Sequence, residues 1–394
     1  MNDSRSDAQR TSAPCSPCLG GSIFLRQALA SVGRFWVVLL LLVCACGGPA
    51  WGEAYLKSFR AAQRAYHAGR YEQAAALYER AAGEATRVKD RDEAMFMRAR
   101  MYERMRRWTD ARAAYKKLIE TSPKGPRTGR ALYEYAQLEI EQGNAEAGWR
   151  LLREAIERYP DHGSARRALG DWAQEVVRRD GEGGLRRELG ILLTKVRGHD
   201  VEQQAKYEHA MSLERSGELR GAHDAFVMLA RDHPYPEGTL TDDAWLRAAK
   251  LAEQLGDHRQ AIEDLRALLA VREVAQGGSY ERPRYPEAQM RIAEIYRDGL
   301  RDREAARREF RKTYRNHSTS ILADDAMWHA ALLSLALGDR GDACSVARDL
   351  RKREPASRYR KCVHELCNDV GSVKGERPCP PYLKRQLNGK SQDE

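Results

Sequence analysis

The chain has 394 residues, a formal net charge of +10 and charged side chains at 31% of its positions. Its 31 glycines and 14 prolines exclude a collagen-like or low-complexity chain, and a hydrophobic fraction of 42% is sufficient for a packed core. Alanine, arginine, leucine and glutamate dominate the composition, which favours an all-α fold.

Residues 1–52 are predicted to be a polar leader followed by an export signal. An apolar stretch of eleven residues begins at Phe35, directly after Arg34, whereas a membrane-spanning helix needs about 20 apolar residues. A short apolar run behind a positive charge is typical of a secretory signal. The four residues that end at Cys46 resemble a bacterial lipobox, so Cys46 is the expected lipidation site. Cleavage before Glu53 by an ordinary signal peptidase, or an uncleaved anchor, are the alternatives.

A lipidated Cys46 implies an exported protein that is bound to the membrane by its N-terminal lipid. Gly47 follows in place of the aspartate that retains many lipoproteins in the inner membrane. By resemblance we therefore expect the periplasmic face of a Gram-negative outer membrane; a soluble periplasmic or secreted protein is the alternative. An exported protein with excess positive charge is expected to meet anionic polymers or acidic proteins and no nucleic acid.

An internal repeat extends over most of the remaining chain. One residue, which we call the anchor, recurs at spacings of 37, 37, 37, 37, 39, 45 and 37, and it is small in seven of its eight occurrences. A second small residue stands twelve positions earlier, and mostly apolar residues stand four and seven positions later. Positions i, i+4 and i+7 share one face of a helix, so the pattern predicts paired helices that cross at small residues. The anchors are Ala74, Ala111, Gly148, Leu185, Ala222, Ala261, Ala306 and Ala343.

The repeat resembles the tetratricopeptide repeat, most closely in the runs GRYEQAAALY at residues 69–78 and DHRQA at 257–261. The resemblance implies an α-solenoid of about eight helical hairpins that share one continuous core. The runs TDDAW at 241–245 and LADDAMW at 322–328 are similar to periplasmic members, namely the outer-membrane lipoprotein of β-barrel assembly and the cell-division coordinator protein. The paired aspartates are expected only to favour the dipole of a first helical turn.

The same pattern divides the chain into segments. Repeats 1–6 are expected over residues 53–274, a loop between repeats over 275–286, repeats 7 and 8 over 287–353, a capping helix over 354–373 and a flexible tail over 374–394. The small residue twelve positions before the seventh anchor is missing, but Ala293 replaces it if the turn holds one extra residue. Two rigid arrays joined at the loop are expected.

Aromatic residues predominate fifteen positions before the anchors. In the resembled family this position faces the concave groove, which implies five candidate partner-binding residues: Phe59, Phe96, Tyr133, Tyr207 and Trp328. Aromatic rings supply contact area at a low entropic cost, which suits a peptide or an extended polymer. The alternative is that these rings pack between neighbouring repeats.

Four cysteines follow Cys46, namely Cys344, Cys362, Cys367 and Cys379. In an oxidising compartment they indicate two disulfides. Cys344–Cys362 with Cys367–Cys379 is the favoured pairing, although exchanging Cys362 and Cys367 fits the spacing equally well. A zinc site that also uses His364 is the alternative, but a single residue between Cys362 and His364 on a helix would point them apart.

No HExxH, GxSxG, P-loop or CxxCH motif occurs, and the repeats occupy nearly all of the chain after the signal. We therefore expect no enzyme, metal or cofactor. The favoured function is a membrane-tethered scaffold that holds envelope proteins or peptides in its groove. The alternative is a binding module for an anionic envelope polymer such as peptidoglycan or lipopolysaccharide.

Overall fold

The computed structural model describes residues 52–271, 284–371 and 378–387, and all regular secondary structure in these ranges is helical. The predicted all-α solenoid is confirmed. The hairpins are α2 (Glu53–His67) with α3 (Tyr71–Glu84), α4 (Val88–Arg104) with α5 (Trp108–Thr121), α6 (Thr128–Glu141) with α7 (Ala145–Arg158), α8 (Gly163–Lys195) alone, α9 (Asp200–Arg215) with α10 (Leu219–Asp232), α11 (Thr241–Gln254) with α12 (His258–Ala270), α13 (Arg284–Glu294) with α14 (Arg303–Asn316), and α15 (Ala323–Ala336) with α16 (Arg340–Arg353).

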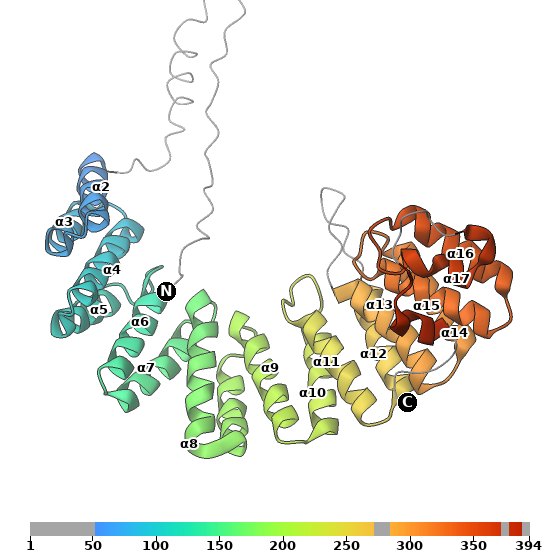
Figure 1. Ribbon diagram of the computed structural model, residues 1–394. Coiled ribbons are helices and arrows are strands. Elements are labelled where there is room, and N and C mark those ends of the chain that lie inside the picture. Colours follow the sequence, from blue (N-terminus) through green and yellow to red (C-terminus); the bar gives the residue numbers. More distant parts are fainter. Residues whose placement is uncertain (1–51, 272–283, 372–377, 388–394) are drawn as a thin grey trace, which may run out of the picture.

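Each of these helices packs mainly against the helix before it and the helix after it. Figure 1 shows the result, an open arc of hairpins. From α2 to α7 the first helix of each hairpin lies on the inner side of the arc and the second helix on the outer side (Figure 1). We call the surface formed by the first helices the inner face. None of the helices described is both long and apolar enough to cross a membrane.

The repeat pattern marks the core correctly. All eight anchors are buried, as are the small residues twelve positions earlier and the residues four and seven positions later. Gly148 shows why the anchors are small. A Cβ atom there would lie 2.4 Å from Cγ1 of Ile140 and 2.8 Å from the carbonyl oxygen of Ala136. The two helices of this hairpin therefore approach each other through a position that holds no side chain.

The turn inside most hairpins needs a left-handed residue. Glycine occupies it in five turns, with φ between 73° and 83°, at Gly69, Gly143, Gly217, Gly256 and Gly338. Repeats 2 and 7 have no glycine there, and Arg106 and Arg301 take φ values of 57° and 54° instead. A non-glycine residue pays about 1 kcal/mol for that conformation.

Repeat 4 departs from the expected hairpin. Its two helices form the single element α8, and the loose turn predicted around residues 179–184 is a kink within it. Gly181, with φ 69° and ψ −177°, is the residue that breaks the helical geometry. Ala173 before the kink and Leu185 after it are both buried, so the repeat keeps its packing.

Repeat 7 contains the extra residue that its spacing predicts. A π-helix, η1 (Ile295–Gly299), follows α13 directly, and a π-helical turn accommodates one residue more than an α-helical turn. Ala293 is accordingly buried. Most of the predicted loop, residues 275–283, lies outside the described residues, but its last three residues are the first turn of α13.

The apolar core continues across this loop. Tyr285 and Ile292 of α13 belong to the same buried cluster as Ala248 of α11 and Leu265 of α12. The hydroxyl of Tyr285 also donates a hydrogen bond to the carbonyl oxygen of Val271. The expected separation into two arrays therefore has no counterpart in the packing, because repeat 7 stacks on repeat 6.

The predicted capping helix over residues 354–373 is wrong. That segment contains three short pieces, η2 (Arg360–Cys362), α17 (Val363–Leu366) and η3 (Asn368–Val370). The predicted flexible tail is also wrong in part, because α18 (Pro381–Leu387) folds back and buries Leu383. Residues 374–377 and 388–394 lie outside the described residues.

Two disulfides hold these pieces. Cys344 of α16 pairs with Cys367, with their Cα atoms 5.2 Å apart, and Cys362 pairs with Cys379, with their Cα atoms 4.7 Å apart. The favoured pairing was therefore wrong, and the exchanged pairing is present. Both bridges stay inside the terminal core, which contains all four cysteines. Since all four sulfur atoms are oxidised, no thiolate remains for the zinc alternative.

Candidate functional site

The five predicted groove residues differ in how accessible they are. Phe59, Tyr133 and Tyr207 are half-buried, whereas Phe96 and Trp328 are 5% and 0% exposed. The last two therefore offer no surface to a partner, and their prediction as binding residues is wrong. In both cases another part of the chain covers the ring.

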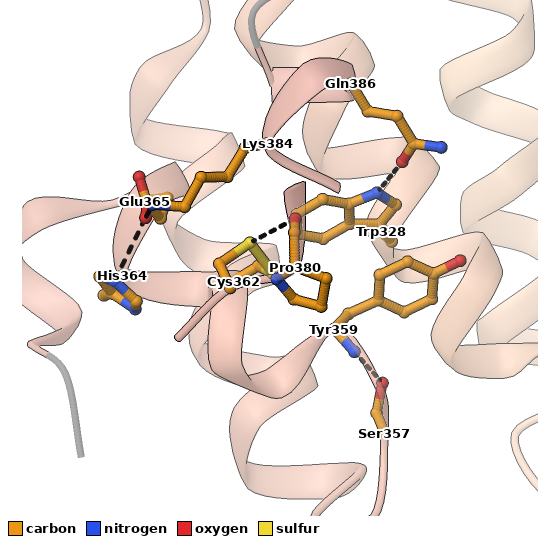
Figure 2. The surroundings of a disulfide bond; sticks show 10 residues. Trp328, Ser357, Tyr359, Cys362, His364, Glu365, Pro380, Lys384 and Gln386 are labelled. Atoms are coloured by element: carbon orange, nitrogen blue, oxygen red, sulfur yellow. Dashed lines mark hydrogen bonds and ion pairs between the residues drawn. A yellow bond between two sulfur atoms is a disulfide. The ribbon is translucent and has the colours of Figure 1, made fainter. Parts of the chain in front are cut away.

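The C-terminal pieces cover Trp328 (Figure 2). The ring of Tyr359 stacks on its indole with centroids 4.9 Å apart and planes 16° apart. From α18, Gln386 accepts a 2.9 Å hydrogen bond from the indole N–H. The ion pair of Lys384 with Glu365, at 2.6 Å, ties α18 to α17 beside this contact. The groove position of the last repeat is thus filled by the chain itself.

Phe96 is covered by the next repeat. The guanidinium of Arg127 lies 5.7 Å from the centroid of its ring and forms an ion pair with Glu93 of the same helix, α4. On its other side the ring lies 6.0 Å from that of Tyr115, which is buried in α5. Phe96 therefore serves packing between neighbouring repeats.

The two tyrosines are bonded to the following repeats. The hydroxyl of Tyr133 donates to Asp171 at 2.9 Å, and the hydroxyl of Tyr207 donates to Asp243. Burial, assisted by the Asp171 bond, raises the pKa of Tyr133 to about 12. Each hydroxyl therefore stays protonated at neutral pH and donates to an aspartate of the following repeat. Only part of each ring faces outward.

The paired aspartates of repeats 6 and 8 do more than was expected of them. Asp243 accepts bonds from Tyr207 and, at 3.0 Å, from Arg247. Burial opposes its ionisation, but these bonds outweigh burial and hold the pKa of Asp243 below its usual value. Asp325 accepts a 2.5 Å bond from Tyr359 and a 2.7 Å bond from Arg358. The sequence shows the acidic pair but not the distant donors, so this role was missed.

An open hollow lies between α11 and α13, the first helices of repeats 6 and 7. Its volume is about 590 Å³, within the size range of ligand sites. Its apolar lining comes from Leu246, Ala249, Leu265, Met290 and Leu322, and its charged lining from Asp243, Arg247, Lys250, Glu253, Arg284, Glu287, Arg291 and Glu294.

Leu246 and Met290 occupy the groove position in these two repeats. Each lies three residues before the small residue of its first helix, as Phe59 precedes Ala62. Counting fifteen residues back from Ala306 gives Arg291 instead, because the π-helix adds one residue. The hollow therefore forms where the groove position carries an unbranched or aliphatic side chain and no aromatic ring fills the space.

Ion pairs join the two helices that form the walls. Arg291 of α13 bonds to Glu253 of α11 through two contacts of 2.9 and 2.5 Å. Arg284 reaches Asp243 at 3.4 Å near the other end of the hollow. The shared buried core of α11 and α13 holds the two helices together, and these bridges add to it at the surface. Among the described residues, no cluster of His, Cys, Asp and Glu is arranged to hold a metal.

Helical hairpins stacked in sequence around one continuous core define the class of this protein, an α-solenoid. Models of the tetratricopeptide repeat match residues 59–126, 97–148 and 246–320, and a further such model matches residues 129–172. The segments 59–172 and 246–320 are therefore similar to tetratricopeptide repeats. This architecture is typically a non-enzymatic scaffold for protein–protein interaction.

The chain is also similar to several solved structures. One is the C-terminal part of a tetratricopeptide-repeat protein from Cytophaga hutchinsonii, with 16% identity, a TM-score of 0.40, and 68% of this chain and 98% of that chain covered. Another is a tetratricopeptide-repeat protein from Parabacteroides merdae, with 14% identity, a TM-score of 0.31, and 72% of this chain and 99% of that chain covered. A third is PilF of Pseudomonas aeruginosa, with 16% identity, a TM-score of 0.32, and 62% of this chain and 97% of that chain covered. No curated protein sequence matches the chain.

Proposed function

We propose that this protein is an exported interaction scaffold that binds a segment of a partner protein on its inner face, in the hollow between α11 and α13. The observation that carries the proposal is the hollow itself. It combines an apolar floor, where Leu246 and Leu322 are half-exposed, with walls that share one buried core and are bridged by ion pairs. A preformed, partly apolar concavity is the usual form of a binding site.

The hollow also differs from the rest of the groove. At Phe96 and Trp328 the equivalent space is filled by the chain, and at Tyr133 and Tyr207 the side chains are bonded to the next repeats. A partner that reaches repeats 6 and 7 can bury the exposed parts of Leu246 and Leu322. Burial there contributes about 25 cal/mol per Å² of apolar area.

Site-specific photo-crosslinking tests the location of the site. A photoreactive phenylalanine analogue replaces Leu246 in one variant and Met228 in another, since Met228 is 63% exposed on the second helix α10. We expect the Leu246 probe to form a discrete adduct with an envelope protein in intact cells. Equal adducts from both positions, or an adduct from Met228 alone, would contradict a binding site at the hollow.

Export and membrane attachment form the second part of the proposal. Cys46 and the rest of the signal lie outside the described residues, so their support comes from the sequence pattern. The two disulfides add support, because such bridges persist mainly in oxidising compartments. Labelled palmitate should be incorporated into the wild-type chain and not into a Cys46→Ala variant. Equal labelling would show that Cys46 is not the lipidation site.

An anionic envelope polymer is the alternative partner. Helix α14 favours it, with six basic and two acidic residues among its 14 positions. Arg307, however, forms ion pairs with Asp339, which caps α16, and with Asp342 of α16. Arg311 also pairs with Asp342, and Arg308 and Lys312 pair within α14. Polymer binding through this surface should weaken steeply with salt, whereas binding in the hollow, which also depends on apolar contact, should weaken much less. A salt titration of partner binding separates the two.

A further inference from the structure

Lys250 is the one charged side chain lining the hollow that bonds to no other described residue. The lining contains four acidic and four basic side chains. Each of its three arginines is held by two carboxylates: Arg247 by Asp243 and Glu214, Arg284 by Asp243 and Glu287, and Arg291 by Glu253 and Glu294. Lys250 is exposed on α11 and has no such contact.

These contacts decide which charge an incoming ligand can satisfy. Because the eight lining charges sum to zero, their combined field favours neither sign. A cationic ligand would have to compete with an arginine at every carboxylate of the lining. An anionic ligand, by contrast, finds the ammonium group of Lys250 with its three donors unused.

Lys250 also lies beside the apolar floor. It follows Leu246 by four residues on α11, and residues at that spacing share one helical face with Cβ atoms about 5–6 Å apart. Met290 lines the same hollow from α13. A carboxylate bound to Lys250 would therefore lie about one helical turn from an apolar side chain seated against Leu246.

We infer that the hollow binds a segment of a partner protein in which a large apolar residue lies within one helical turn of an aspartate or glutamate. The inference rests on the proposed function and specifies its partner. The apolar side chain covers the exposed part of Leu246, while the carboxylate accepts a hydrogen bond from Nζ of Lys250. The bound segment shields this ion pair from water, which strengthens it relative to a pair on an open surface.

A phage-displayed library of random linear peptides, selected on the full-length chain, tests this inference. Peptides that are enriched are synthesised, and their affinities are measured for the wild type and for Lys250→Glu, Lys250→Gln and Leu246→Asp variants. Lys117→Glu is the matched control, because Lys117 is an exposed lysine on the second helix α5. It undergoes the same charge change on a different face.

We expect the enriched peptides to combine an apolar residue with an acidic residue, and Lys250→Glu to weaken binding about tenfold or more while Lys117→Glu leaves it unchanged. A peptide whose acid is replaced by lysine should prefer the Lys250→Glu variant. Peptides that lose affinity with Leu246→Asp but not with Lys250→Glu would overturn the inference and leave the site in place. Peptides that are insensitive to both would overturn the site as well.

Discussion

The indole N–H of Trp328 donates a 2.9 Å hydrogen bond to Oε1 of Gln386, 58 residues further along the chain. Trp328 belongs to α15, the first helix of the last repeat, and Gln386 belongs to α18. The bond therefore joins the end of the solenoid to a segment that lies beyond every repeat. It shows that the terminal groove position is closed by the chain's own C-terminal helix.

Substituting Leu383 tests how α18 is held over Trp328. Leu383 is 1% exposed in the terminal core, so Leu383→Ala should cost about 2–4 kcal/mol and loosen α18. The indole of Trp328 then meets water, and its fluorescence emission should shift to longer wavelength. Because the chain has seven tryptophans, the signal is taken as the difference between each variant and the same variant carrying Trp328→Phe.

The neighbouring residue supplies the control. Tyr382 precedes Leu383 on α18 but is 36% exposed, so Tyr382→Ala should leave the emission of Trp328 unchanged. If the two substitutions shifted the emission equally, the buried face of α18 would not be what covers the indole.

Replacing glycine by alanine should have opposite effects on stability at a helix crossing and away from one. Gly148→Ala places a Cβ 2.4 Å from Ile140, so it should destabilise the fold by about 1–3 kcal/mol. Gly170 lies within α8, and a Cβ atom there would meet no other atom within 4 Å. Gly170→Ala should therefore stabilise the fold by about 0.5–1 kcal/mol, through helix propensity alone. Urea unfolding measures the free energy of unfolding of both variants. If it changed in the same direction for both, the close helix crossing at Gly148 would be refuted.

The repeat register was predictable because it is local. A small residue at a crossing and apolar residues one and two turns later are enough to place a hairpin, and even the π-helix was signalled by the displacement of Ala293. The groove was less predictable, since the exposure of Phe96 depends on Arg127 in the next repeat and that of Trp328 on Tyr359 and Gln386. The sequence gives the residue type at each groove position, but it does not show which other residues cover that side chain.

The disulfide pairing was undecided for a related reason. The observed bridges close separations of 23 and 17 residues, and the other pairing closes loops of similar length, so chain entropy does not separate them. The positions of η2 and η3 decide it, and neither short piece has a sequence pattern. The hollow did have a signal, because Leu246 and Met290 stand where other repeats carry aromatic rings.

Substituting Tyr207 tests whether its ring stabilises the fold or only offers surface to a partner. Its ring lies 5.5 Å from that of Phe226 and its hydroxyl is bonded to Asp243. Tyr207→Phe, which keeps the ring, should cost about 1 kcal/mol, and Tyr207→Ala about 2–4 kcal/mol. Met228→Ala, on an exposed side chain, is the control for thermal unfolding. A Tyr207→Ala variant that melts at the same temperature as this control would show that the ring contributes groove surface and not packing.

The final prediction concerns pH and Glu103, near the C-terminal end of α4. Burial raises the pKa of its carboxyl to about 7. The Tyr115 hydroxyl and Arg100 oppose this rise, whereas Glu134 and Glu141 add to it. The unfolded chain titrates this group near its ordinary value of about 4.3. Between these two values the folded state binds more protons than the unfolded state, so the contribution of Glu103 to stability falls as pH rises and is lowest above about pH 7.

Glu103→Gln removes the ionisation. The variant should therefore be more stable than the wild type by about 1–3 kcal/mol at pH 8, and the two should converge near pH 4. Urea unfolding across this pH range measures the difference, with Glu120→Gln on the exposed surface of α5 as the control. A Glu103→Gln variant that tracks the wild type at every pH would show that this carboxyl ionises as freely in the folded protein as in the unfolded chain.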